Sequence, residues 1–183
     1  MEASLKEKLN NDLKQALRNG EKVKLGTIRM VLSAAKNAEM AKRAKLMVAT
    51  ANKAGTELNK LELSPGQIAE ISKQAELEDA DIITVIAREI KQRNESIEAY
   101  KLGNRPDLVA VEEAELAVLL TYMPKQVSHE EVVAIAQRIL TEVGARGPGD
   151  KGKVMPKIIG ELKGKADGKE INAVVTELLS AIH

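Results

Sequence analysis

The chain has 183 residues, a net charge of +1 and 44% apolar residues, which is typical of a folded protein with one or two domains. It contains no cysteine, which excludes disulfides, zinc knuckles and a thiol nucleophile. Tyr100 and Tyr122 are the only aromatic residues, so the sequence lacks the stacking platforms of single-strand readers. No apolar run approaches the roughly 20 residues of a membrane span, and the N-terminus lacks an apolar signal core. We therefore expect a cytoplasmic protein.

The charge is distributed unevenly along the chain. Residues 1–47 carry a net charge of +6, residues 57–116 carry −7, and residues 146–169 carry +4. Basic ends around an acidic middle indicate one or two surfaces for an anionic partner. For residues 1–47 taken alone, a solvated surface of mixed charge is an equally good interpretation.

Helical patterns cover the first 123 residues. Ser4 and Glu7 have the spacing of a capping box, and the leucines that follow recur every four residues until Gly20. Further helices are predicted over residues 21–54, 64–75, 79–103 and 106–122. Their apolar positions predict the core, and they include Leu5, Leu9, Leu13, Leu17, Val23, Ile28, Val31, Leu32, Ile82, Ile83, Ile86, Ile90, Ile97, Leu108, Val111, Leu116, Leu119 and Leu120.

Residues 124–127 are predicted to be a tight linker at a domain boundary. Ser128 and Glu131 form another capping box, Gly144 closes that helix, and two more helices follow. Pro156 lies in the first turns after Lys151, so we expect that helix to start later or to bend. No segment alternates with a period of two. The sequence therefore predicts an all-α fold, with an N-terminal helical domain (residues 1–123) and a C-terminal three-helix domain (residues 127–183).

The most distinctive stretch is residues 151–169, which places lysines and glycines around two short apolar helices. This arrangement suits the holding of a phosphate backbone, and Arg146 is a weaker addition. The candidate binding residues are Lys151, Lys153, Lys157, Lys163, Lys165 and Lys169. Asp167 is predicted to cap the last helix, while the backbone amides at that helix start are also suited to a phosphate, and both roles remain open.

Signals for catalysis are weak. Residues 147–154 match a P-loop except at Val154, where a hydroxyl is needed for Mg²⁺, and a helix rather than a strand is predicted before them. His129 and His183 are the only histidines and suggest neither a metal cluster nor a catalytic base. We therefore predict no catalytic residue, no metal site and no cofactor.

Several blocks, in order, resemble the GatB/YqeY family, which includes the tail of the amidotransferase B subunit. They are residues 27–32, 35–39, 90–97, 112–116, 122–126, 152–155 and 163–169, followed by Asn172 and Val175. The resemblance implies a four-helix unit followed by a three-helix unit, acting as an accessory that touches the tRNA body while other domains perform chemistry. Residues of about 48–76 look like an insertion relative to that pattern.

The leading hypothesis is therefore a non-catalytic tRNA-interacting module, related to glutamine-dependent amidotransferase systems. The alternative is a protein-interaction adaptor that docks on a tRNA synthetase or amidotransferase through residues 48–76 or the acidic segment 57–116. A stable bundle whose lysines only confer solubility also remains open. The family label of carbon–nitrogen ligase, with glutamine as amide donor, would apply to a complex, because this chain lacks the domains for that reaction.

Overall fold

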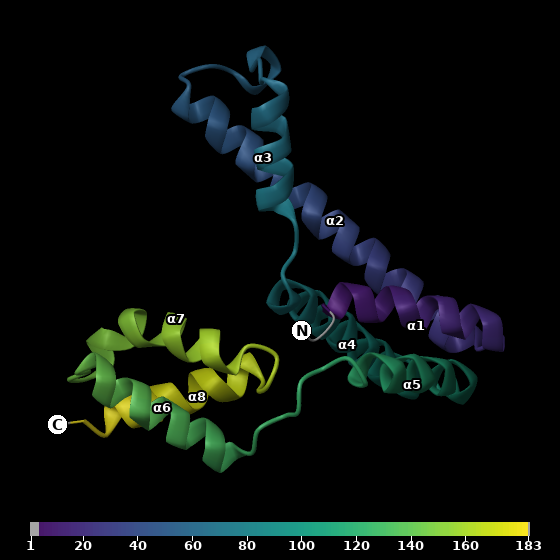
Figure 1. Cartoon of the computed structure of the whole chain (residues 1–183). Coiled ribbons are helices and arrows are strands. Elements are labelled where there is room, and N and C mark those ends of the chain that lie inside the picture. The colour runs from purple at the N-terminus through teal and green to yellow at the C-terminus, as the bar shows by residue number, and fades with distance from the viewer. Residues whose placement is uncertain (1–3, 183) are drawn as a thin grey trace. The chain divides into compact units, whose positions relative to one another are not determined.

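A computed structural model describes residues 4–182, and these residues form an all-α fold (Figure 1). The segment contains eight α-helices and two short 3₁₀ turns, and no strand occurs within it. The predicted fold class is confirmed. The chain divides into two compact units, Met1–Tyr122 and Met123–His183, which are described separately.

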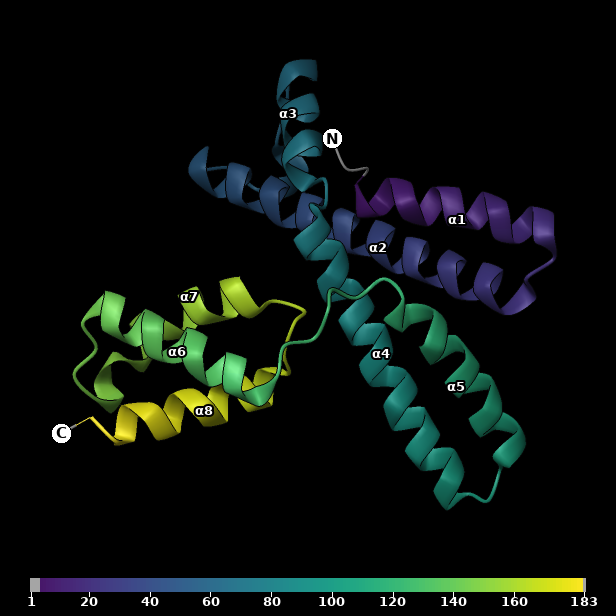
Figure 2. The same ribbon diagram turned by 60° about the horizontal axis from the view of Figure 1, so that its bottom comes forward.

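The first unit contains five helices, which Figure 2 shows from a second side. They are α1 (Leu5–Asn19), α2 (Lys22–Lys53), α3 (Pro65–Ala75), α4 (Asp79–Leu102) and α5 (Pro106–Leu120), with a 3₁₀ turn at Leu58–Lys60. The second unit contains α6 (His129–Val143), α7 (Lys151–Leu162) and α8 (Gly168–Ser180), with a 3₁₀ turn at Pro148–Asp150.

Local capping signals set several of the helix boundaries. Ser4, Ser64 and Ser128 each accept a hydrogen bond from the third backbone amide of their helix, and the Glu or Gln there returns a bond to the cap. Gly20 and Gly144 end α1 and α6 in the left-handed conformation, with φ of 70° and 66°. These five positions are as the sequence predicted.

The core of the first unit lies between α1, the first half of α2, α4 and α5. Its fully buried side chains are Leu9, Ile28, Ile82, Ile86, Leu119 and Val31. Four predicted core residues are instead exposed: Leu17 (61%), Val23 (47%), Val111 (52%) and Leu120 (52%). The reason is clear in α1. Steps of four residues advance about 40° beyond a full turn each, so Leu17 rotates away and Ala16, seven residues after Leu9, is buried in its place.

A buried arginine joins three helices of this unit. Arg93 in α4 is 7% exposed, and its Nε donates to Glu115 Oε2 of α5 at 2.7 Å. Glu112 Oε2 lies 3.2 Å from the same nitrogen, but no hydrogen bond to this buried oxygen exists within residues 4–182. Arg93 Nη2 also contacts Met30 Sδ of α2 at 3.2 Å. The cluster thus holds one cation between two carboxylates.

Tyr122 closes the opposite end of α5 against α1. Its hydroxyl donates to Asp12 Oδ2 at 2.8 Å, and the Lys8 ammonium lies 5.4 Å from the ring centre, within cation–π range. Burial of the phenol, and then its bond to Asp12, raise the pKa of Tyr122. The end of the first unit is therefore tied to its beginning.

Helix α2 extends beyond the rest of its unit. Its 32 residues span roughly 48 Å at 1.5 Å per residue. Both ribbon views show the second half of α2 projecting away from α1, α4 and α5, with α3 packed on it (Figures 1 and 2). We call residues 40–75 the α2–α3 arm. The segment interpreted as an insertion, residues 48–76, forms most of this arm.

The second unit is a three-helix bundle around one apolar core. Val132, Ile139, Val154, Ile158 and Leu162 are buried with the inner faces of α8. Helix α7 begins at Lys151 and continues through Pro156, so of the two expected effects of this proline the later start is wrong and the bend stays a prediction. Pro156 occupies an exposed position in the first half of this helix. Ile159 is also exposed (45%), because it lies on the flank of the helix and not on its inner face.

Candidate nucleic-acid interface

The turn between α7 and α8 is fixed by the chain segment that enters the second unit. Gly164 adopts a left-handed conformation with φ of 75°, which glycine permits without steric cost. Its carbonyl accepts a 2.8 Å bond from the Gln126 side chain, and the Lys165 carbonyl accepts a 3.0 Å bond from the Val127 amide. These two bonds hold the backbone that carries the predicted lysines.

The lysines at the start of α7 are already engaged within the unit. Lys151 Nζ donates to Thr176 Oγ1 of α8 at 2.8 Å. Lys153 Nζ pairs with Asp150 Oδ1 at 2.8 Å, and this bond lowers the pKa of the Asp150 carboxyl. The Arg146 amide donates to the other oxygen of Asp150 at 2.9 Å. Asp150 therefore offsets part of the positive charge at this end.

The lysines around the α7–α8 turn are more available. Lys165 and Lys169 are exposed, and no ion pair or hydrogen bond of their ammonium groups occurs within the described residues. Lys157, on the outer face of α7, is likewise exposed and makes no ion pair or hydrogen bond within the described residues. Lys163 is half-buried and makes an interaction of its own.

The structure therefore divides the six predicted lysines into two groups. Helix α7 has 12 residues and is roughly 18 Å long, so Lys151 and Lys153 are separated by its length from Lys163, Lys165 and Lys169. Lys157 lies between these groups. Lys165 and Lys169, the exposed members of the second group, are the better candidates for a phosphate contact.

Acidic neighbours are partly neutralised by other partners. Glu161, at the end of α7, pairs with Arg138 of α6. Asp167 caps α8 by accepting a 2.6 Å bond from the Lys169 amide, as predicted. Because the Asp167 carboxylate occupies that amide, lysine ammonium groups are better placed than the helix end to contact a phosphate. Glu170 lies 3.0 Å from His129 Nδ1.

The basic N-terminal segment is concentrated on one helix. Helix α2 carries eight Lys and Arg residues and a single acidic residue, Glu39. The Glu39 carboxylate accepts a 2.7 Å bond from Lys6 of α1, so it is occupied. The net charge of +6 over residues 1–47 indicated a cationic segment but did not place it on a surface. The spacing of the basic residues along α2 was the signal that could have done so.

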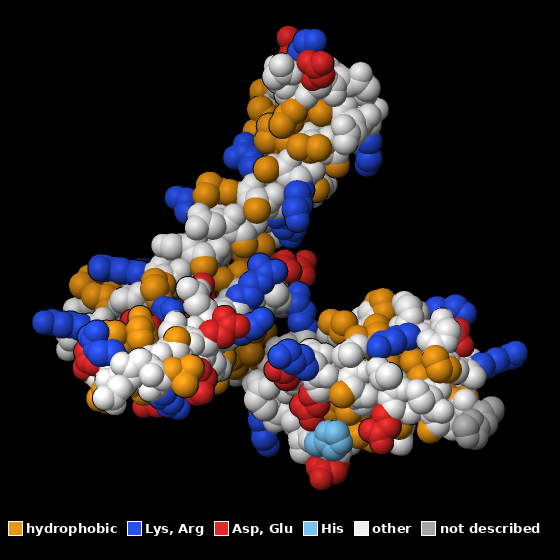
Figure 3. Space-filling view, turned by 180° about the vertical axis from the view of Figure 1, so that it is seen from behind, with side chains coloured by type: hydrophobic (Ala, Val, Ile, Leu, Met, Phe, Trp, Pro, Cys, Tyr) orange, Lys and Arg blue, Asp and Glu red, His pale blue; other side chains and the backbone are white. Residues whose placement is uncertain are grey.

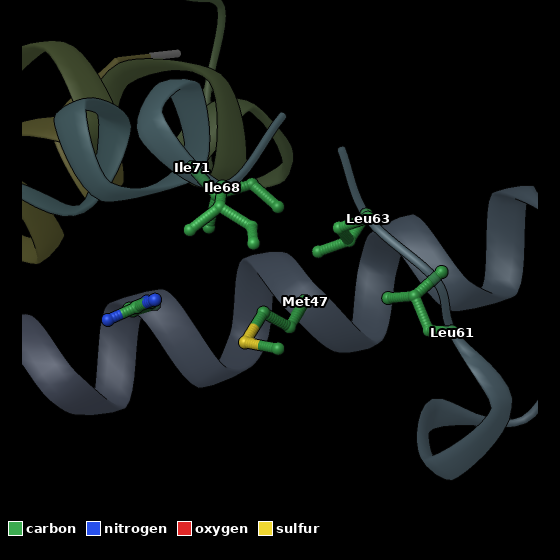
Figure 4. Close-up of a pocket in the computed structure, with 6 residues that line it drawn as sticks. Met47, Leu61, Leu63, Ile68 and Ile71 are labelled. Atoms are coloured by element: carbon green, nitrogen blue, oxygen red, sulfur yellow. The ribbon is translucent and has the colours of Figure 1, made fainter. Parts of the chain in front are cut away.

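The α2–α3 arm holds an apolar pocket of about 320 Å³. Figure 4 shows Met47 of α2 facing Ile68 and Ile71 of α3, with Leu61 and Leu63 from the connecting segment beside them. Arg43 completes the lining. Ile68 is 41% exposed, and the space-filling view shows hydrophobic side chains gathered along this arm (Figure 3). The pocket is thus apolar with one cation at its edge.

The residues that resemble a P-loop lack the preceding strand that a P-loop requires. They span the 3₁₀ turn at Pro148–Asp150 and the start of α7, and helix α6 precedes them. From residue 4 to residue 182, no three His, Cys, Asp or Glu side chains group as metal ligands. In the same part of the chain, no helix combines the length and apolar character needed to cross a membrane.

Comparison with known proteins places the chain in a family. The family model described as Yqey-like protein matches residues 6–54 and 48–179. The altered inheritance of mitochondria protein 41, mitochondrial, of Pyrenophora tritici-repentis is 28% identical over 129 residues, which cover 68% of this chain and 71% of that protein. Two overlapping matches that together span nearly all helices of both units leave little of the chain outside the family pattern. The chain belongs to the YqeY-like family.

Proposed function

We propose that this protein is a non-catalytic module of the GatB/YqeY type that binds the body of tRNA through its second unit. The observation that carries the proposal is the α7–α8 turn, where Lys165 and Lys169 are exposed on a backbone held by Gln126 and Val127. A fixed turn presents its cations with little loss of backbone entropy on binding. Lys157 and Lys163 add positive charge nearby in the sequence.

The kind of contact follows from the composition. Tyr122 is buried, and Tyr100 is the only other aromatic side chain, so base stacking contributes little. Lysines contact backbone phosphates without reading sequence, and paired RNA is recognised mainly by shape and backbone. The proposed module would therefore bind many tRNAs with similar affinity. The cytoplasm is its proposed location, and the related amidotransferase chemistry would belong to partner domains.

Exchanging Lys165 and Lys169 together for glutamine is expected to weaken tRNA binding. Each phosphate contact contributes about 0.7 to 0.9 to the slope of log affinity against log salt, so the double variant should have a slope shallower by about 1.4 to 1.8. Filter binding of total tRNA across a salt series measures this slope. The control is Lys91→Gln with Lys101→Gln, which removes the same charge from lysines paired with Glu95 and Glu98 on α4. Equal affinity of both double variants, or no tRNA binding at low salt, would reject the proposal.

The pocket in the α2–α3 arm favours a second candidate function, a protein-interaction adaptor. An apolar segment with an acidic residue beside its anchors would match the aliphatic lining and the Arg43 guanidinium. The proposed source is a tRNA synthetase or an amidotransferase. Ile68→Glu should abolish capture of such a partner by the immobilised chain after nuclease treatment, whereas Glu70→Gln on the outer side of the same helix should not. Partners that are lost with the RNA would instead support the first function.

A further inference from the structure

The solvent face of α2 carries a regular row of cations. Lys22, Arg29, Lys36 and Arg43 follow one another at intervals of seven residues. Seven residues fall about 20° short of two full helical turns, so these four side chains share one face and drift across it by about 60° in total. We call them the α2 basic row. It extends over roughly 32 Å at 1.5 Å per residue.

The row is exposed and uncompensated. All four residues are exposed, and no ion pair or hydrogen bond of their side chains occurs between residues 4 and 182. Other basic residues of the same helix do have partners: Lys24 pairs with Glu21, and Lys42 pairs with Asp81. Glu39 lies between Lys36 and Arg43 in sequence, but Lys6 Nζ and the Leu77 amide bind its carboxylate. Lys45 and Lys53 are also exposed and have no such partner between residues 4 and 182, but they lie on other sides of the helix. The row is therefore distinguished by the alignment of its four cations on one face.

The residues beside the row leave room for a close approach. Four positions after Lys22, Arg29 and Lys36 come Gly26, Ser33 and Met40, which lie next to them on the helix. A Cβ added at Gly26 would meet nothing within 4 Å, so this surface is open. Of these three only Met40 is large and apolar, and Met47, four positions after Arg43, lines the apolar pocket of the α2–α3 arm. The row therefore lacks the continuous apolar seam that a partner helix or a membrane surface would need.

A duplex backbone is the partner that fits these features. The row places a cation about every 10.5 Å along a straight helix, so it presents a regular series of positive charges to a regular series of phosphates. Tyr100 and Tyr122, the two aromatic residues, are on other elements, so the stacking that holds single strands is absent from this face. A polyanion with regularly repeated charges is more complementary to a regular row of cations than an isolated acidic patch is.

We propose that the α2 basic row binds the phosphate backbone of double-helical RNA, as a site separate from the lysines of the second unit. This inference rests on the proposed tRNA-binding function and adds a surface to it. The row contacts phosphates of the two strands on either side of a groove and reads no base sequence. Binding therefore depends on salt and on duplex structure, and two sites in separate units bind one long RNA more tightly than either does alone.

The test compares three variants of the full chain, with total tRNA and a 24-base-pair RNA duplex as probes. The first is Arg29→Gln/Lys36→Gln/Arg43→Gln, in exposed helical positions where glutamine preserves helix propensity. The matched control is Lys60→Gln/Lys91→Gln/Lys101→Gln, which removes three charges from lysines already paired. The third is the Lys165/Lys169 double variant. We expect the first variant to make the salt slope shallower by about 2 to 3 for both probes, while the control changes it little.

The outcomes separate this inference from the proposed function. Loss of affinity in the Lys165/Lys169 variant with none in the α2 variant overturns the α2 site and leaves the function in place. Loss in the α2 variant alone supports the site and moves tRNA binding away from the second unit. A single strand of 24 nucleotides bound as tightly as the duplex overturns duplex recognition. Binding of the wild type to anionic phospholipid vesicles, lost in the α2 variant while RNA binding is kept, overturns the assignment to RNA. Ser33→Glu, which puts a carboxylate inside the row, should weaken RNA binding without removing any cation.

Discussion

Replacement of Arg93 by methionine is expected to destabilise the first unit by about 3–5 kcal/mol, the cost of removing one partner of a buried ion pair. Arg93 has a side chain only 8% exposed, and it lies between the carboxylates of Glu112 and Glu115. Without the guanidinium, two negative charges would face each other in a poorly hydrated site, and Met30 would lose its contact. Urea unfolding followed by circular dichroism measures the change as a lower midpoint at an unchanged slope.

Two further variants show whether the buried charge is the cause. Arg88→Met removes an exposed arginine from the same helix and should change stability by less than about 0.5 kcal/mol. Adding Glu112→Gln and Glu115→Gln to Arg93→Met should restore much of the lost stability, because no charge then remains buried. If the triple variant is as unstable as Arg93→Met, loss of packing and not uncompensated charge explains the effect.

Substitution of Ile158 by alanine is expected to cost about 2–5 kcal/mol in the second unit. Ile158 is fully buried between Val154 and Leu162 along α7, facing α6 and α8, so the change leaves a cavity in a small core. Hydrogen exchange resolved by peptide should show faster exchange in α6, α7 and α8, with α1, α2, α4 and α5 unchanged. The neighbouring Ile159 is 45% exposed, and Ile159→Ala should stay within about 0.5 kcal/mol.

This pair also tests how the lysines of the second unit act. Ile158→Ala removes no charge, so any loss of tRNA affinity that accompanies it must come from the loss of a fixed α7–α8 turn. Affinity that persists while α6–α8 exchange rapidly would contradict the role given to the bonds from Gln126 and Val127.

Several residues in the blocks that resemble the family have structural roles that the sequence did not reveal. Arg93 and Glu115 form the buried ion pair, Glu39 binds Lys6, and Tyr122 bonds to Asp12. The partners are separated by 22, 33 and 110 positions, respectively. Such pairings depend on how helices pack, and no local pattern specifies them. A motif read along the chain cannot tell a buried ion pair from a binding site.

The candidate site was predicted in composition but not in arrangement. The sequence drew attention to residues 151–169, and Lys165 and Lys169 are indeed exposed beside a turn. The pairing of Lys153 with Asp150 and the hydrogen bond from Lys151 to Thr176 were not predicted. For the basic N-terminal segment, only the net charge was predicted, and not the arrangement of its cations on a surface. The positions of Lys22, Arg29, Lys36 and Arg43 on one face become visible only when helical periodicity is applied to charged residues as well as apolar ones.

The sequence by itself determined the all-α class, the caps at Ser4, Ser64, Ser128 and Asp167, and most helix ends, because these depend on interactions between residues a few positions apart. Tertiary structure alone decided which apolar residues are buried, which charges are neutralised, and where α2 leaves its bundle to form the arm. Those outcomes depend on which helix faces meet, and packing selects Ala16 over Leu17 although both are apolar and adjacent. The surfaces left for a partner are what remains after that selection.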